Sequence, residues 1–134
     1  MQDLNVSIIQ TEIIRNDPGA NHQHFEERIK RIKEATDLII LPEMFTTGFP
    51  SDPKKYAEKP EGPSLSWMKK IASGKNAVVA GGLMLEIDGK YYNALVWMPP
   101  DGNYQTYFKR HVFALGDESA LISPGKEKLI LNLK

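Results

Sequence analysis

Cysteine is absent from the sequence, so disulfide bonds, thiolate metal sites and cysteine nucleophiles are excluded within these 134 residues. Long hydrophobic runs are absent as well. Uninterrupted apolar stretches reach only a few residues, which is too short for a membrane-spanning helix. Residues 1–15 lack the basic start and the apolar stretch of a secretory signal, and we expect a cytoplasmic location.

The sequence carries no net charge, because 17 basic residues balance 17 acidic ones. The chain therefore has no global field to attract nucleic acid or an anionic membrane, and we expect neither as a partner. Hydrophobic residues make up 41% of the sequence and charged residues 25%, as in a globular domain rather than a disordered segment. At this length a chain can bury a sizeable core.

The order of the predicted elements is that of an α/β protein. Apolar, partly β-branched runs at residues 4–10 and 38–41 predict two buried strands. Between them, apolar residues recur at helical spacing and predict an amphipathic helix over residues 18–35. A strand, a helix and an all-apolar strand in this order are typical of a βαβ unit with parallel strands.

The rest of the chain predicts a second helix and then a meander of strands. A long loop rich in Pro and Lys, residues 50–63, precedes a short helix that ends near Gly74. Asp88-Gly89 predicts a hairpin turn, because both residues tolerate positive φ. The expected strands are residues 77–85, 91–98, 104–109 and 129–133.

The last predicted strand begins close to residue 134. A strand in that place is atypical of the end of an α/β domain, and the predicted sheet also keeps a long apolar edge unpaired. We therefore expect residues 1–134 to form the N-terminal portion of a larger domain.

Glu43 and Lys109 are the two candidates for chemistry at strand ends. Glu43 follows the buried strand 38–41 at the edge of the sheet where α/β proteins bind ligands, and a partly desolvated carboxylate there can act as a general base. Lys109 ends the predicted strand 104–109 and can present a fixed cation to a developing oxyanion. The residues alone leave two alternatives open. In the first alternative, Glu43 is a solvated carboxylate in a turn. In the second, Lys109 belongs to a basic turn with Arg110 and His111.

A possible metal site at His22, His24 and Glu26 is weak. His22 and Glu26 are four residues apart on one helix face, but His24 points elsewhere and no third ligand is evident. We interpret these residues as a helix surface and expect no metal.

Two further motifs lack the context that a functional site requires. Gly81-Gly82 has neither the spacing nor the following helix of a phosphate-binding loop, and close strand packing is the better interpretation. Ser64 and Ser66 have no nucleophile-elbow context.

Three segments resemble signatures of the carbon–nitrogen hydrolase (nitrilase) superfamily. Leu-Pro-Glu43-Met-Phe-Thr-Thr-Gly-Phe49 resembles the signature around the family's general base. Tyr107-Phe-Lys109-Arg-His-Val-Phe113 resembles the signature around the Lys that stabilises the tetrahedral intermediate. Gly116-Asp-Glu118 matches the position of the family's second Glu, which orients that Lys.

The resemblance implies a fold and an activity. Residues 5–10 and 92–97 are similar to the family's opening and mid-domain strands, so the resemblance runs along the whole chain. The implied fold is the N-terminal part of a nitrilase-type αββα sandwich, an α/β class with a mixed sheet and helices on one face. The segments around Glu43 and Lys109 look most like those of ω-amidases, which deamidate 2-oxo acid amides. The resemblance implies a small-molecule amide as partner, a homo-oligomer, and no metal or organic cofactor.

The sequence departs from the family at the nucleophile. The family's Cys lies just beyond a position like Lys134, whereas this sequence contains no Cys. We therefore expect an N-terminal half that carries a general base (Glu43), an oxyanion stabiliser (Lys109) and a supporting carboxylate (Glu118). Alone it should be inactive as an amidase. The alternative is a non-enzymatic half-domain that acts as a subunit or binding module.

Overall fold

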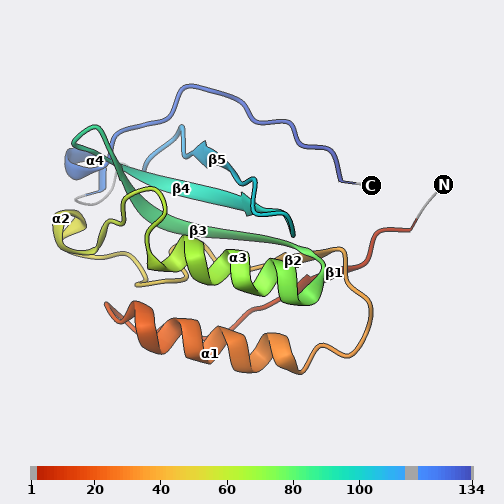
Figure 1. The fold of residues 1–134 in the computed structure, drawn as a ribbon. Helices are drawn as coiled ribbons and strands as arrows, with labels where there is room; N and C mark the ends of the chain where they lie inside the picture. Colours follow the sequence, from red (N-terminus) through yellow and green to blue (C-terminus); the bar gives the residue numbers. More distant parts are fainter. Residues whose placement is uncertain (1–2, 114–117, 134) are drawn as a thin grey trace.

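The computed structural model describes residues 3–113 and 118–133, and its centre is one five-stranded mixed sheet in the order β1-β2-β3-β4-β5 (Figure 1). The strands are β1 (Val6–Ile8), β2 (Leu38–Ile40), β3 (Val78–Ile87), β4 (Lys90–Met98) and β5 (Gln105–Phe108). The helices are α1 (Pro18–Lys30), α2 (Pro53–Tyr56), α3 (Pro63–Lys75) and α4 (Glu118–Leu121).

The predicted parallel βαβ unit is confirmed, since β1 pairs in parallel with β2 and β2 with β3. α1 begins after Asp17, whose side chain accepts a hydrogen bond from Ala20 N at 3.0 Å, with Pro18 in the first turn. The helix ends at Lys30 rather than at residue 35. There the amides of Arg31 and Ile32 bond the carbonyls three residues earlier, which tightens the last turn.

The predicted meander is confirmed as well. β3, β4 and β5 pair antiparallel in sequence order. Asp88 (φ 50°) and Gly89 (φ 72°) form the tight turn between β3 and β4, as two residues with positive φ should.

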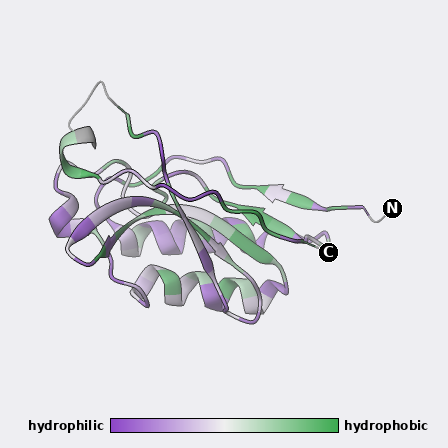
Figure 2. Ribbon diagram, turned by 90° about the horizontal axis from the view of Figure 1, so that it is seen from above, coloured by the Kyte–Doolittle hydropathy of each residue, from purple (hydrophilic) through white to green (hydrophobic). Residues whose placement is uncertain are grey.

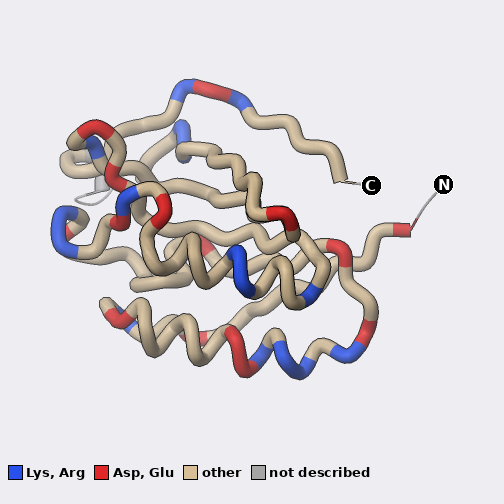
Figure 3. The backbone as a smooth tube through the Cα atoms, viewed as in Figure 1, with Lys and Arg blue, Asp and Glu red and all other residues tan. Residues whose placement is uncertain are grey.

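α1 and α3 lie on the same face of the sheet and bury its core (Figure 1). Their apolar side chains, among them Phe25, Ile29, Met68 and Ile71, pack against the inward-facing residues of β2, β3 and β4. Hydrophobic residues predominate in β2 and β3, whereas hydrophilic and hydrophobic residues alternate along the helices (Figure 2). Acidic and basic residues are interspersed along the described chain (Figure 3). None of the described helices has the length and apolar character needed to cross a membrane.

The opposite face of the sheet retains exposed apolar side chains. Val6 is 43% exposed, Ile8 71% and Leu95 39%. The β1–β2, β2–β3 and β3–β4 registers place all three on the side away from Ile39 and Val79, which face the helices. One face is therefore a packed core. The other is covered near Met84, which is buried with Met44 and Ile122, and exposes apolar side chains on β1 and β4.

Two expectations on local structure are wrong. Residues 129–133 form no strand, because the described part of this segment has no neighbouring strand to pair with, and Ile130 is 90% exposed. The chain that leads to this segment is bonded to the sheet region, because Ser123 N donates to Tyr91 O and Gly125 N to Lys109 O. The long loop 50–63 is also more structured than expected, since it contains α2 and a bridge between Glu58 and Leu85.

Candidate active site

Glu43 is held beside β3 by the backbone on both sides of it. After β2 ends, Leu41 N donates to Ala80 O at 2.8 Å and Phe45 N to Gly82 O at 2.9 Å. The carboxylate therefore stands just beyond the carboxyl end of β2, as predicted. The turn that follows uses a left-handed residue, Met44 (φ 53°), a backbone conformation that is strained for a side chain of this kind.

Gly81 and Gly82 allow this close approach. A Cβ on Gly82 would lie 3.0 Å from the Cα of Glu43, and one on Gly81 would lie 3.0 Å from the ring of Phe45. The expectation of close packing at these two glycines is confirmed. Larger residues here would push the Glu43 segment away from β3.

Lys109 lies immediately after β5, and its backbone is bonded on both sides. Its N–H donates to Asn93 O on β4, and its carbonyl accepts from Gly125 N, each at 2.9 Å. β4 and the segment after α4 therefore fix the backbone from which the Lys109 side chain extends.

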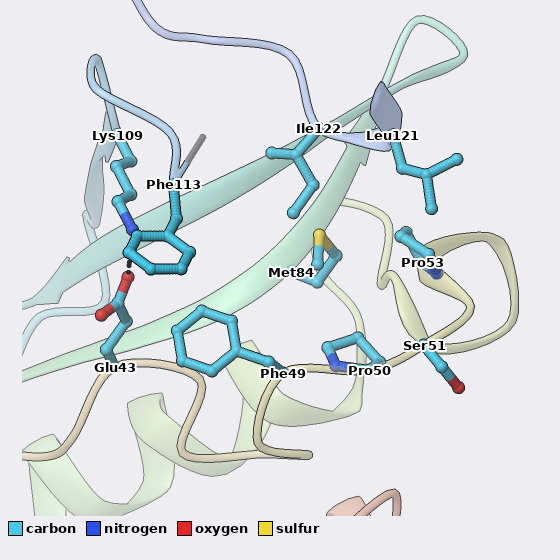
Figure 4. A pocket seen from close by; sticks show the side chains of 10 residues that line it. All are labelled: Glu43, Phe49, Pro50, Ser51, Pro53, Met84, Lys109, Phe113, Leu121 and Ile122. Atoms are coloured by element: carbon cyan, nitrogen blue, oxygen red, sulfur yellow. Dashed lines mark hydrogen bonds and ion pairs between the residues drawn. The ribbon is translucent and has the colours of Figure 1, made fainter. Parts of the chain in front are cut away.

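The side chains of Glu43 and Lys109, 66 residues apart in sequence, meet in an ion pair (Figure 4). Lys109 Nζ lies 3.0 Å from Glu43 Oε1. The same oxygen accepts a 2.6 Å hydrogen bond from Nδ2 of Asn93, a buried residue of β4. Both bonds reach Oε1, and Oε2 receives neither. A carboxylate and an ammonium held in this way can move a proton and stabilise a negatively charged oxygen.

Asn93 is the site residue that sequence reasoning missed as a functional group. From the sequence, Asn93 is predicted only as part of the strand segment 92–97. The available signal was a single amide side chain among the apolar and aromatic residues that follow Lys90 in this strand. Such a group is buried only when it is hydrogen-bonded.

The ion pair remains partly open to solvent. The side chain of Glu43 is 48% exposed and that of Lys109 29%. The partial desolvation expected for Glu43 is therefore modest within this chain. An ion pair this exposed typically contributes only ~0–1 kcal/mol to stability, so a purely structural role accounts poorly for it.

A cavity of about 480 Å³ opens next to the ion pair. Glu43 and Lys109 lie at one end of it, and apolar side chains form most of the remaining wall (Figure 4). That wall consists of Phe49, Pro50, Pro53, Met84, Phe113, Leu121 and Ile122, with Ser51. A second cavity of about 310 Å³ also has Glu43 and Lys109 in its lining, together with Asn93 and Tyr107. The ion pair therefore borders both cavities.

The remaining sequence candidates lie elsewhere. Glu118 begins α4, but its side chain lies outside the described part of the structure, as do Gly116 and Asp117. His111 is exposed and does not line either cavity. Among the described residues, no group of three His, Cys, Asp or Glu side chains is arranged to hold a metal ion.

The interpretation of His22 as part of a helix surface is wrong. The ring is half-buried, stacks on Trp67 with centroids 5.1 Å apart, and places Nε2 2.7 Å from Ser64 Oγ. Apolar periodicity could not reveal this, because the partners come from α3, far along the chain.

Several known proteins are similar to this chain in sequence or in fold. The E. coli (strain K12) ω-amidase YafV is 30% identical over 131 residues, which is 98% of this chain and 50% of that protein. The Bacillus subtilis 2-oxoglutaramate amidase is 29% identical over 91% of this chain and 48% of its own. The crystal structure of XC1258 from Xanthomonas campestris, a CN-hydrolase superfamily protein, superposes with a TM-score of 0.95 at 34% identity. It covers 100% of this chain and 51% of that one.

A family model and solved structures also match this chain. The chain spans about half the length of the curated relatives it matches. The family model for carbon-nitrogen hydrolases matches residues 5–131, nearly the full sequence. The α/β fold with its mixed sheet also agrees with the solved structures of that superfamily. The chain therefore belongs to the carbon-nitrogen hydrolase family.

Proposed function

We propose that this chain supplies the general base and the oxyanion-stabilising cation of an amidase that acts on small 2-oxo acid amides. The observation that carries the proposal is the 3.0 Å contact between Glu43 and Lys109 at the mouth of an apolar cavity. The substrate class comes from the names of the relatives, an ω-amidase and a 2-oxoglutaramate amidase. No residue of this chain can act as the thiol nucleophile, so a cysteine must come from outside these 134 residues. In this proposal, residues 1–134 are the N-terminal portion of the complete domain.

The proposed first step forms a thioester. Glu43 accepts the proton of the cysteine thiol, and the thiolate attacks the amide carbon. Negative charge then develops on the carbonyl oxygen, where the ammonium of Lys109 stabilises it. As the C–N bond breaks, Glu43 returns the proton to the departing ammonia.

The second step regenerates the thiol. Glu43 removes a proton from water, and the hydroxide attacks the thioester carbon. The C–S bond breaks, Glu43 returns its proton to the departing thiolate, and the acid product loses its proton to solvent as a carboxylate. Glu118 acts in this proposal as the supporting carboxylate that keeps Lys109 charged and in position. The reaction as written needs no metal and no organic cofactor.

Ammonia release from 2-oxoglutaramate tests the proposal. The 134-residue chain alone should release none above buffer. A chimera that joins it to the part of the Xanthomonas protein it does not match should be active, and Glu43→Gln in the chimera should abolish that activity. Turnover by the isolated chain that disappears in Glu43→Gln would contradict the requirement for an external thiol. A chimera that folds but is inactive would contradict the amidase assignment.

One observation favours a second candidate, a non-enzymatic half-domain that binds another chain. The sheet face away from the helices exposes Val6, Ile8 and Leu95. An apolar face of this kind is typical of a surface that another layer covers. Stable complex formation with a partner, together with a folded but inactive chimera, would favour this candidate over the amidase.

A further inference from the structure

The wall of the 480 Å³ cavity is an arch of chain with two points of attachment to β3. The first is the segment up to Phe45, whose N–H donates to Gly82 O. The second is Glu58, whose N–H donates to Met84 O at 3.0 Å and whose carbonyl accepts from Glu86 N at 2.8 Å. Residues 46–57 span the distance between the two attachments. They carry Phe49, Pro50, Ser51 and Pro53 into the cavity wall (Figure 4).

The carboxylate of Glu58 ties the second attachment to α3. Oε2 accepts from Ser64 N at 2.8 Å, and Oε1 accepts a short hydrogen bond from Ser64 Oγ. The N-cap residue of this 13-residue helix, Gly62, has no side chain, so Glu58 satisfies a free amide of the first turn in its place. A Cβ on Gly62 would lie 2.6 Å from Glu58 Oε2, which only glycine avoids.

His22 on α1 completes the cluster. Its Nε2 lies 2.7 Å from Ser64 Oγ. The single hydroxyl proton of Ser64 points to the carboxylate, so the oxygen accepts and His22 donates through Nε2–H. Burial lowers the pKa of His22, which favours the neutral imidazole. The stacked ring of Trp67 holds the imidazole in this orientation.

The cluster does not have the properties of a second catalytic site. Ser64 is fully buried, so its hydroxyl, which donates to Glu58, is closed to a substrate. Burial raises the pKa of Glu58, while its two bonds from Ser64 oppose that rise. A buried polar cluster of this kind is a weak source of stability compared with apolar packing, but it does fix geometry.

We propose that Glu58, Ser64 and His22 form a latch that fixes the cavity wall formed by residues 49–53 relative to β3, with Glu58 as a positioning residue. The latch joins three elements that meet at the far end of the arch: α1, α3 and the bridge to β3. It thereby sets the width of the cavity next to Glu43 and Lys109. The proposal rests on the proposed function only where it assigns that cavity to the substrate.

Hydrogen exchange on the 134-residue chain tests the latch without any catalytic activity. Glu58→Gln replaces an acceptor oxygen by an NH₂ group that faces donors of Ser64. The amides of Lys55, Ala57 and Glu58 bond Asp52, Pro53 and Met84 and report on the arch. We expect them to exchange at least about tenfold faster in the variant, as the loss of a charge-assisted hydrogen bond predicts.

Exchange at Leu83 and Leu85, within the β3–β4 ladder, should be unchanged in Glu58→Gln. Glu61→Gln is the matched control, because it removes the same charge from an exposed position in the same loop. Ser64→Ala should accelerate exchange at the same arch amides and shift the Nε2 resonance of His22. Equal acceleration of the arch and of β3 would indicate global destabilisation and overturn the proposal, as would no acceleration at all.

Kinetics of the active chimera test the link to the substrate. Glu58→Gln should raise KM for 2-oxoglutaramate at least about fivefold and change kcat less than about twofold, as loss of uniform binding predicts. An accelerated arch with unchanged KM would overturn the positioning role. If no chimera is active, the proposed function fails, while the exchange result still decides whether the latch exists.

Discussion

At the scale of single residues, Glu43 Oε1 receives hydrogen bonds from two sources, Asn93 in β4 and Lys109 after β5. Two donors on one oxygen restrict rotation of the carboxylate, so the other oxygen keeps a defined direction. That arrangement suits a group that must accept and return a proton at one place. In the proposed mechanism, Oε2 is therefore the basic atom and Oε1 the tethered one.

Lys109→Ala in the active chimera should lower kcat by about 100- to 1,000-fold, the typical effect of removing one preorganised oxyanion donor. KM should change far less, because the ammonium acts on charge that develops only in the transition state. Steady-state ammonia release measures both constants. His111→Ala is the control, since this exposed neighbour lines neither cavity. Equal losses in both variants, or an effect on KM alone, would show that Lys109 is only a binding cation.

Asn93→Ala should lower kcat of the chimera by roughly 10- to 100-fold, because a hydrogen bond to a charged group is typically worth ~1.5–3 kcal/mol. The buried amide holds Glu43 at 2.6 Å, and alanine removes one of the two donors that restrict rotation of the carboxylate. The same ammonia assay reports the change. Asn103→Ala, an exposed amide in the turn before β5, should have no effect. A fully active Asn93→Ala variant would contradict the tethering role.

At the scale of elements, α1 and α3 are joined by a polar contact inside an otherwise apolar interface. His22 of α1 bonds Ser64 of α3, and the surrounding contacts come from Phe45 and Trp67. Stability should therefore depend on the protonation of one half-buried ring. Burial lowers the pKa of His22 in the folded chain below the ordinary value of 6.5.

The sign of this effect follows from proton uptake. Below pH 6.5 the unfolded chain binds a proton at His22, while the folded chain resists it, so acidification favours unfolding. The free energy of unfolding should fall as the pH drops from 7 through 6.5 towards the lowered pKa. The slope is at most about 1.4 kcal/mol per pH unit for one proton. Urea unfolding across pH 5–7.5 should show this slope in the natural chain and a flatter one in His22→Gln.

Glu58 should change the free energy of unfolding with pH in the opposite direction. Burial raises its folded pKa above 4.5, so its contribution is largest in acid and is lost as the pH rises through that folded pKa. Glu58→Gln removes this opposing contribution, so the free energy of unfolding should fall more steeply on acidification than in the natural chain. For His22, the control is His111→Gln, which changes an exposed histidine. Identical pH slopes in the natural chain and in His22→Gln would contradict the role assigned to His22.

At the scale of the whole molecule, the two long helices, α1 and α3, both cover the same side of the sheet (Figure 1). The other side carries the ion pair and the apolar residues Val6, Ile8 and Leu95. In an αββα sandwich, that side is the one on which a second sheet packs. The site and the open face therefore lie on the same side of the molecule.

The isolated chain should self-associate through this face. Sedimentation velocity should show a weight-average mass that rises with concentration, because exposed apolar surface favours association. The double variant Ile8→Lys and Leu95→Lys should shift the chain towards monomer. Gln23→Lys, on the exposed side of α1, should leave association unchanged. A cooperative, concentration-independent monomer of the natural chain would show that the face needs no cover.

Local pattern determined the elements and the positions of the two candidate residues. Apolar runs predicted β1 to β5, helical spacing predicted α1 and α3, and Asp88-Gly89 predicted the hairpin, because these signals act within a few residues. Glu43 and Lys109 were identified by their places after predicted strands and by resemblance to family signatures. Their catalytic roles stay predictions.

Only the tertiary structure decided which groups meet. Asn93 and Lys109 reach Glu43, and Ser64 reaches His22 and Glu58, through strand order and helix packing that no short window of sequence contains. The same reason explains why two predictions, the strand at residues 129–133 and the helix-surface interpretation of His22, are wrong. Residues 129–133 alternate like a strand but lack a neighbour to pair with, and His22 is on a helix face that α3 covers. A strand and a buried histidine are both defined by their partners, and partners are set by long-range packing.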